Sequence, residues 1–178
     1  MELIQDKQKT AFKSLKEEFH WTNVMQTPHI EKVVVSVGLG SVKDKNKIAL
    51  IADRLGKITG QKPATRGAKK AIATWKTRQG DVIGYQITLR NARAQDFINR
   101  LIHIALPRTK DFKGISAASV DEMGNYTLGL REHSVFPETA DEELKDVFGM
   151  AATIVTSAKS APEAKAYLAH LGFPFKKK

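Results

Sequence analysis

The feature that most constrains the fold is a strict alternation of apolar and polar side chains in the segment YQITLR, Tyr85 to Arg90. A period of two predicts a β-strand, because successive side chains of a strand point to opposite faces of the sheet. One face of this strand should be buried and the other open. The buried side chains are expected to be Tyr85, Ile87 and Leu89, and the open ones Gln86, Thr88 and Arg90.

Three further segments predict strands. Ile30 to Leu39 is rich in β-branched residues and stops at Gly38 and Gly40, while Asn125 to Arg131 and Ala151 to Ser157 follow later in the chain. The expected inward residues are Val33, Val35, Val37, Tyr126, Leu128 and Leu130, and the outward ones are Val34, Ser36, Asn125, Thr127 and Arg131.

Four segments predict helices, the first three because apolar residues recur in them at spacings of three and four, and the fourth because a capping box opens it. These segments are Leu3 to Phe19, Asp44 to Thr59, Asn91 to Pro107 and Ser160 to Leu171. The expected boundary residues are Gly60 as a C-terminal cap, Asn91 as an N-terminal cap, Pro107 as a stop, and Ser160 with Glu163 as a capping box that has Pro162 in the first turn.

A run of one charge sign occupies the middle of the chain, where six basic residues and no acidic one lie between Gln61 and Gly80. Such a run next to an open polar strand suits the phosphate backbone of RNA, although a solvated basic loop has the same composition. We predict a basic hairpin at about 63–90, with a rising strand from Ile72 to Arg78, a turn at Gln79-Gly80-Asp81 and a returning strand from Val82 to Arg90.

Strands interleaved with helices predict an α+β fold, a two-layer sandwich of an antiparallel or mixed sheet with helices packed on one face. The other face would stay open and polar. The length of 178 residues and the apolar content of 42% predict a single domain over residues 1–178.

Charge and composition narrow the function. Lysine plus arginine number 29 against 19 aspartate plus glutamate, and the net charge of +10 favours a nucleic acid over a membrane surface. Cysteine is absent, which excludes disulfides, thiolate zinc sites and cysteine nucleophiles. No apolar run reaches membrane-spanning length and the charged start does not fit a secretory signal, so we expect a cytosolic protein. We also expect no cofactor, metal or small-molecule substrate.

The signals for an enzyme are weak. Gly38-Leu39-Gly40 follows a predicted strand, but Lys43 stands where a dinucleotide fingerprint has its third glycine. The acidic run from Glu138 to Asp146 is more typical of an exposed helix than of an acid/base pair, and its sharper interpretation is a contact with a basic protein.

The open sheet face is the better candidate for a function. Its hydroxyl, amide and guanidinium groups suit the shallow minor groove of structured RNA, although an ordinary solvated face has similar residues. Aromatic residues are only 7% of the chain, which argues against a base-stacking platform, and Trp75 either stacks on a base or packs beneath the hairpin. The candidates, projecting from adjacent strands, are Ser36, Gln86, Thr88, Arg90, Thr127 and Arg131.

The chain resembles, over essentially its whole length, the bacterial family of the fifth protein of the large ribosomal subunit. The resemblance rests on the order and spacing of several segments rather than on one motif. They are VMQTPHIEKVVVSVGLG, LGKITGQKP, TWKTRQGDVIGYQITLR, RLIHIALPRTKDFKGIS, GNYTLGLREHSVFPE and LGFPFKKK.

The resemblance implies a concave sheet face that binds 5S ribosomal RNA in the central protuberance, with 23S ribosomal RNA and neighbouring proteins close by. It implies contact of the hairpin loop with transfer RNA in the peptidyl site, and a bridge to the thirteenth protein of the small subunit. The 5S-binding residues would be Ser36, Gln61, Lys62, Thr88 and Arg90 with Lys69 and Lys70; the transfer-RNA residues Thr74, Trp75, Lys76, Thr77, Arg78 and Gln79; and the bridge residues Arg108, Lys110, Lys113, Glu138, Asp141 and Glu142.

Two positions depart from the family pattern. Ser36 replaces the usual asparagine, which shortens one contact to RNA or routes it through water, and Arg66 replaces a small hydroxyl residue. Two rival functions stay open: a free-standing regulator that binds messenger RNA or DNA outside the ribosome, and a nucleotide-dependent enzyme that uses Gly38-Leu39-Gly40.

Overall fold

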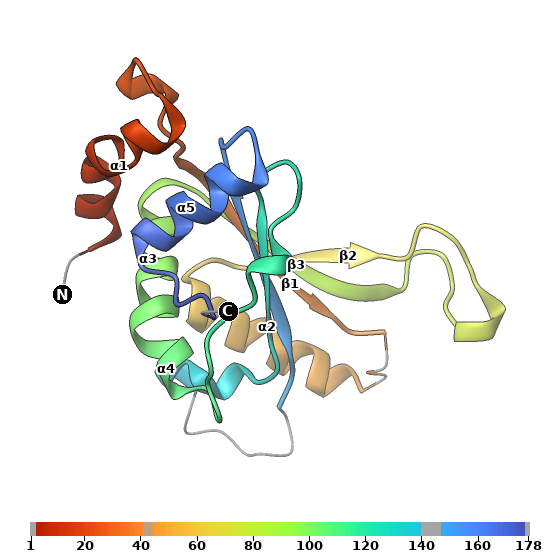
Figure 1. Cartoon of the computed structure of the whole chain (residues 1–178). Helices are drawn as coiled ribbons and strands as arrows, with labels where there is room; N and C mark the ends of the chain where they lie inside the picture. Colours follow the sequence, from red (N-terminus) through yellow and green to blue (C-terminus); the bar gives the residue numbers. More distant parts are fainter. Residues whose placement is uncertain (1–2, 41, 43, 140–146, 177–178) are drawn as a thin grey trace. The chain divides into compact units, whose positions relative to one another are not determined.

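The computed structural model describes residues 3–40, 42, 44–139 and 147–176. The chain forms an open, five-stranded antiparallel sheet in an α+β two-layer fold, which confirms the predicted class (Figure 1). Hydrogen-bonded neighbours follow the order β2-β3-β1-β5-β4. The strands are β1 Ile30–Gly38, β2 Ala64–Gly67, β3 Val82–Leu89, β4 Tyr126–Leu130 and β5 Met150–Thr156.

The helices lie close to the segments that periodicity predicts. The third predicted helix consists of three consecutive pieces, because a π-helical turn separates α3 from α4. The bounds are α1 Ile4–Phe19, α2 Lys45–Thr59, α3 Asn91–Arg100, the π turn Leu101–Ala105, α4 Leu106–Arg108 and α5 Ala161–Leu171.

The chain divides into two compact units. Unit 1 comprises residues 1–33, 89–128 and 153–178, and unit 2 comprises residues 34–88 and 129–152. The single domain expected from length stays a prediction.

Helix α1 packs against α5 and α3 within unit 1. The backbone N–H of Ile4 donates to the side chain of Asn99 at 3.1 Å, and the Lys7 ammonium donates to the carbonyl of Leu171 at 3.3 Å. The core of this unit contains Tyr126 and Tyr167, and burial raises the pKa of each phenol to about 12. These tyrosines therefore stay protonated and serve packing.

Two predicted helix starts in unit 1 are wrong in detail. Helix α3 begins at Asn91 itself, after Arg90, and no side chain caps it. Ser160 precedes α5 as predicted but accepts no capping hydrogen bond. The Glu163 carboxylate accepts from the backbone N–H of Lys159 at 2.8 Å, and not from that of Ser160. The glutamate thus satisfies a backbone donor one residue further out than a capping box would.

Pro107 lies inside α4, and the helix ends one residue later at Arg108. A proline has no N–H to continue the helical ladder. The preceding π turn places the N–H of Leu106 on the carbonyl of Leu101. The expected stop at Pro107 is therefore correct to within one residue.

In unit 2, helix α2 begins after Asp44, whose carboxylate accepts from the backbone N–H of Asn46 at 2.9 Å. It ends at Gly60, which has a positive φ of 68° as expected for a glycine cap. The guanidinium of the buried Arg54 lies 3.3 Å from the imidazole of His133, which in turn stacks on the ring of Phe148. This cluster brings polar groups into the unit 2 core, which also buries Thr59 and Thr139.

The hairpin has a different rising strand from the one predicted. β2 spans Ala64–Gly67, and the predicted strand from Ile72 to Arg78 contains a single 3-10 turn at Ala73–Trp75 and one bridge between Ile72 and Thr77. All four residues of β2 are exposed, so no alternation marks them in the sequence. The returning strand and its buried face are confirmed.

Among the described residues, no helix combines the length and the apolar character that a bilayer crossing requires.

Gly84 provides a test of the close approach between β3 and β1. A Cβ at this position would lie 2.8 Å from the carbonyl oxygen of Val37, which is fixed backbone. Replacing Gly84 by Ala should therefore lower the free energy of unfolding by about 1–3 kcal/mol in urea denaturation. The control is Gly56→Ala, where no atom lies within 4 Å and an alanine in α2 should stabilise by about 0.5–1 kcal/mol. Equal stability of the two variants would contradict the packing described.

Candidate nucleic-acid interface

The open face of unit 2 carries Ser36 on β1 and Gln86 and Thr88 on β3, all half-exposed. The residues that alternate with them, Val35, Val37, Tyr85 and Ile87, are buried. The predicted assignment of each strand to a buried and an open face is thus confirmed. A hydroxyl, an amide and a second hydroxyl lie on neighbouring strands and point to the same side.

The register between strands brings these groups into rows. The backbone N–H of Leu39 donates to the carbonyl of Ile83 at 2.8 Å, and an antiparallel pair continued from there places Ser36 opposite Gln86. On the other side of β3, Ala64 of β2 pairs with Gln86. One row of the open face therefore runs from the edge strand β2 through Gln86 to Ser36.

Arg66 belongs to the same open face. Its Nε donates a hydrogen bond of 2.6 Å to Oε1 of Gln86, and its side chain is exposed. The sequence singles out Arg66 as unusual for the family but gives no sign of this contact. The pairing of β2 with β3 creates it, and β2 is the strand that periodicity does not reveal.

Gln61 and Lys62 follow the C-terminal cap of α2. The hydroxyl of Thr59 donates to the carbonyl of Leu55 at 2.6 Å and accepts from the backbone N–H of Gln61 at 3.4 Å, which fixes the exit of the chain from the helix. Gln61 is half-exposed and Lys62 exposed, and both line a groove of about 640 Å³ between α2 and the strands β2 and β3. The two predicted residues thus border a hollow surface.

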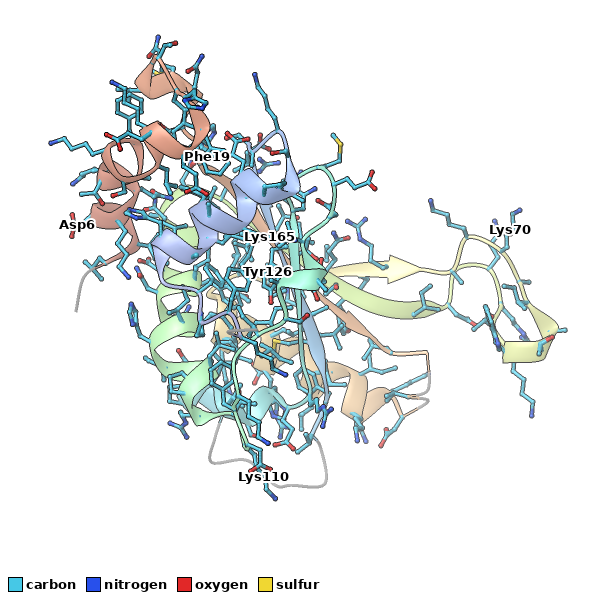
Figure 2. All side chains as sticks on the ribbon, viewed as in Figure 1. Asp6, Phe19, Lys70, Lys110, Tyr126 and Lys165 are labelled. Carbon is cyan, nitrogen blue, oxygen red and sulfur yellow. The ribbon has the colours of Figure 1, made fainter. Side chains whose placement is uncertain are left out.

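The basic hairpin continues beyond β2 and β3 into a long loop (Figure 1). Lys70 lies on this loop with its side chain directed away from the ribbon (Figure 2). The backbone N–H of Arg78 donates to the Asp81 carboxylate at 2.7 Å, which stabilises the predicted turn. Thr77 is half-exposed, and the other predicted contact residues of the loop are exposed: Lys69, Lys70, Thr74, Trp75, Lys76, Arg78 and Gln79.

Trp75 does not pack beneath the hairpin, because 71% of its surface is exposed. Its ring borders two hollows of about 570 and 720 Å³, together with Thr77 and Ile83. Lys69 and Lys70 line the larger hollow and Lys76 the smaller one. An exposed aromatic ring among ammonium groups has the composition of a surface that binds nucleotides.

Other predicted open-face residues do not adjoin Ser36 in the strand order. The expectation that all six candidates project from adjacent strands is wrong, because β5 lies between β1 and β4. Within unit 1, the hydroxyl of Thr127 lies 3.1 Å from that of Thr153 on β5, a residue that the sequence pattern does not single out. Arg131 in unit 2 and Arg90 in unit 1 are exposed.

The residues predicted to form a bridge to the small subunit fall into a basic group and an acidic group. Arg108, Lys110 and Lys113 are exposed in unit 1, and Glu138 is exposed in a 3-10 turn of unit 2. Asp141 and Glu142, like the rest of the acidic run to Asp146, lie outside the described residues.

The sequence matches two family models in succession. The model described as "Ribosomal protein L5" matches residues 23–78, and a second model, which describes the C-terminus of the same ribosomal family, matches residues 82–175. The chain belongs to the ribosomal protein L5 family.

Relatives in this family cover almost the whole chain. A "Large ribosomal subunit protein uL5" of Ureaplasma urealyticum is 50% identical over 93% of this chain and 90% of its own length. Proteins of the same name from Trichlorobacter lovleyi and Flavobacterium johnsoniae are 46% and 50% identical, over 95% and 92% of this chain and 95% and 90% of their own lengths. The resemblance noted in the sequence is thus confirmed.

Membership in the L5 family makes the chain a ribosomal protein and not an enzyme, and the ribosome is its place in the cell. In the structure, Gly38 ends β1, Leu39 is buried, and α2 begins only at Lys45. Across the described ranges, no three histidine, aspartate or glutamate side chains gather as a metal site would require.

The environment of the two tryptophans can be measured directly, because the chain has only Trp21 and Trp75. In a Trp21→Phe variant, the remaining Trp75 should emit as an exposed indole, and iodide should quench it more than caesium because the surrounding lysines attract anions. In the Trp75→Phe control, the remaining Trp21, 7% exposed, should resist both ions. Equal quenching by the two ions in the first variant would contradict a cationic surface around Trp75.

Proposed function

We propose that this chain is a constituent of the large ribosomal subunit that binds 5S ribosomal RNA through the open face of its sheet. The observation that carries the proposal is the row of polar groups on β1 and β3, with Ser36 opposite Gln86 and Thr88 on the same side. Arg66 contacts Gln86 in this row, and no acidic residue occurs between Gln61 and Gly80.

The chemistry of this face suits a folded RNA. Hydroxyl and amide groups donate to and accept from 2′-hydroxyls in the shallow minor groove, and cations contact phosphates. The hydroxyl of Ser36 is shorter than the asparagine usual in the family, so its contact is short in reach or passes through water. Gln61, Lys62, Thr88 and Arg90, with Lys69 and Lys70, supply the remaining contacts in this proposal.

We also propose that the hairpin loop contacts transfer RNA in the peptidyl site. The loop is exposed from Thr74 to Lys76, and Arg78 and Gln79 are exposed as well. Lys76 and Arg78 provide charge, and the exposed ring of Trp75 provides a stacking surface.

The third proposed contact is a bridge to the thirteenth protein of the small subunit. Arg108, Lys110 and Lys113 are exposed in one unit, and Glu138 opens the acidic run of the other. The carboxylates of that run, Asp141 and Glu142 among them, suit a basic partner protein. Adjacent 23S ribosomal RNA and other proteins of the central protuberance complete the expected surroundings.

The first test is a titration with purified 5S RNA and with a transfer RNA of similar length, at two salt concentrations. The proposal expects a preference for 5S RNA that persists at the higher salt, because hydroxyl and amide contacts do not release counterions. Equal and steeply salt-sensitive binding of both RNAs would mean that the isolated chain acts only as a polycation. That result would favour the alternative function of a free-standing regulator.

The division of labour between face and hairpin gives a second test. Arg90→Ala should weaken 5S RNA binding and reduce the slope of log K against log salt by about 0.7–0.9. The double variant Lys76→Ala, Arg78→Ala should spare 5S RNA binding and impair the positioning of transfer RNA on assembled ribosomes, read by footprinting of the transfer-RNA elbow. If both variants lose 5S affinity equally, the hairpin and the face do not have separate roles.

A further inference from the structure

We propose that Arg66 and Gln86 together form a subsite for a phosphate of the RNA backbone. The subsite lies on the open face of the sheet, at the edge strand β2. The proposal rests on the proposed function, since it places RNA on that face. It adds Arg66, which stands at a position where the family usually has a small hydroxyl residue. It also assigns Gln86 the role of a positioning residue for Arg66.

The register of the hairpin explains why these two side chains meet. Ala64 lies opposite Gln86, and Arg66 lies opposite Gly84, so Arg66 and Gln86 are diagonal neighbours on one face. A glycine directly opposite Arg66 leaves no side chain in the way. The long arginine side chain therefore lies across the gap, and its Nε–H reaches Oε1 of Gln86 at 2.6 Å.

This hydrogen bond determines which groups are left for a ligand. A guanidinium has five N–H donors and no acceptor, and an amide has two N–H donors and one carbonyl oxygen. In the described part of the chain, the Nε–H of Arg66 is engaged by the Gln86 oxygen, which leaves the donors on both Nη atoms and on Nε2 of Gln86. The pair therefore presents N–H donors to the outside, with its one acceptor atom already engaged.

A surface of donors with a fixed positive charge selects an anion with several acceptor oxygens. The phosphodiester of RNA has this chemistry, and a guanidinium binds it through two parallel N–H bonds. Guanine O6 and N7 also accept a bidentate arginine, but they carry no charge, and in an RNA helix they lie in a deep, narrow major groove that side chains cannot reach. With Ser36 on the same row beyond Gln86, the subsite extends the proposed RNA surface to the edge strand.

Stabilisation of the fold does not account for the pair. Both side chains are at least partly exposed, and hydrogen bonds of this kind at the surface contribute little to folding. Removing Arg66 should therefore leave the urea midpoint of the protein unchanged, and any loss of RNA binding would come from the lost contact itself.

The test compares Arg66→Ala with Arg93→Ala, in which an exposed arginine of α3 is removed with the same loss of charge. Purified 5S RNA is the probe, titrated at several salt concentrations with the full chain. Arg66→Ala should lower the affinity about tenfold or more and reduce the salt slope by about 0.7–0.9. Arg93→Ala should leave the affinity within about twofold of the wild type, as expected for a charge without a phosphate contact.

Two further variants separate positioning from charge. Gln86→Ala keeps Arg66 but removes the hydrogen bond that orients it. The affinity for 5S RNA should therefore fall by less than in Arg66→Ala, and the salt slope should stay as in the wild type. Arg66→Lys keeps the charge and the slope but should not restore full affinity, because an ammonium cannot hold Gln86 and bind a phosphate through two parallel bonds.

The outcomes distinguish this inference from the proposed function. If the wild type prefers 5S RNA but Arg66→Ala and Arg93→Ala bind it equally, the subsite is wrong and the 5S site stands. If the wild type shows no preference and Arg66→Ala still loses affinity for both RNAs more than Arg93→Ala does, the 5S site is wrong and a general phosphate subsite stands. If Arg66→Ala shifts the urea midpoint, the contact stabilises the hairpin and Arg66→Lys becomes the test. Reduced 5S affinity of Arg66→Lys at an unchanged midpoint would support the subsite, and wild-type affinity would overturn it.

Discussion

The close approach of β3 to β1 is the constraint on which the proposed interface depends. Gly84 has no side chain to separate the strands at Val37. The hydrogen bond from the backbone N–H of Leu39 to the carbonyl of Ile83 sets the register between β1 and β3. That register turns Ser36 and Gln86 outward in one row, while the buried residues beside them form the core of the unit. A shift of one residue would bury the polar groups and expose the valines.

The spacing of apolar residues in the sequence predicts most of the fold, because burial of one face of a strand or helix imposes that spacing. The strands β1, β3, β4 and β5 all have an alternating buried face. The sequence shows the alternation directly in β3 and β4, whereas in β5 the buried Thr156 follows the partly exposed Val155 and polarity does not reveal it. Strand β2 has no buried residue, so its sequence contains no such pattern and the predicted strand lies too late in the chain. The order of strands likewise depends on contacts between distant segments, which is why the position of β5 between β1 and β4 does not follow from the sequence pattern.

The candidate site can be predicted only in part for the same reason. Which residues of a strand face outward follows from alternation, and the prediction places Ser36, Gln86 and Thr88 correctly on the open face. Which of them touch one another depends on register and on strand neighbours. The contact of Arg66 with Gln86 spans 20 positions of sequence and requires β2, so only the folded structure reveals it.

The exposure of the hairpin loop has a consequence for how long its proposed partner would stay bound. Most of its side chains between Lys69 and Gln79 are exposed, and a single bridge between Ile72 and Thr77 joins its two sides. A segment with so little packing loses conformational entropy when a partner immobilises it, and this loss opposes tight binding. If the loop contacts transfer RNA as proposed, weak and rapidly released contacts suit a partner that changes in every round of elongation. The sheet face, by contrast, is proposed to hold an RNA that stays bound.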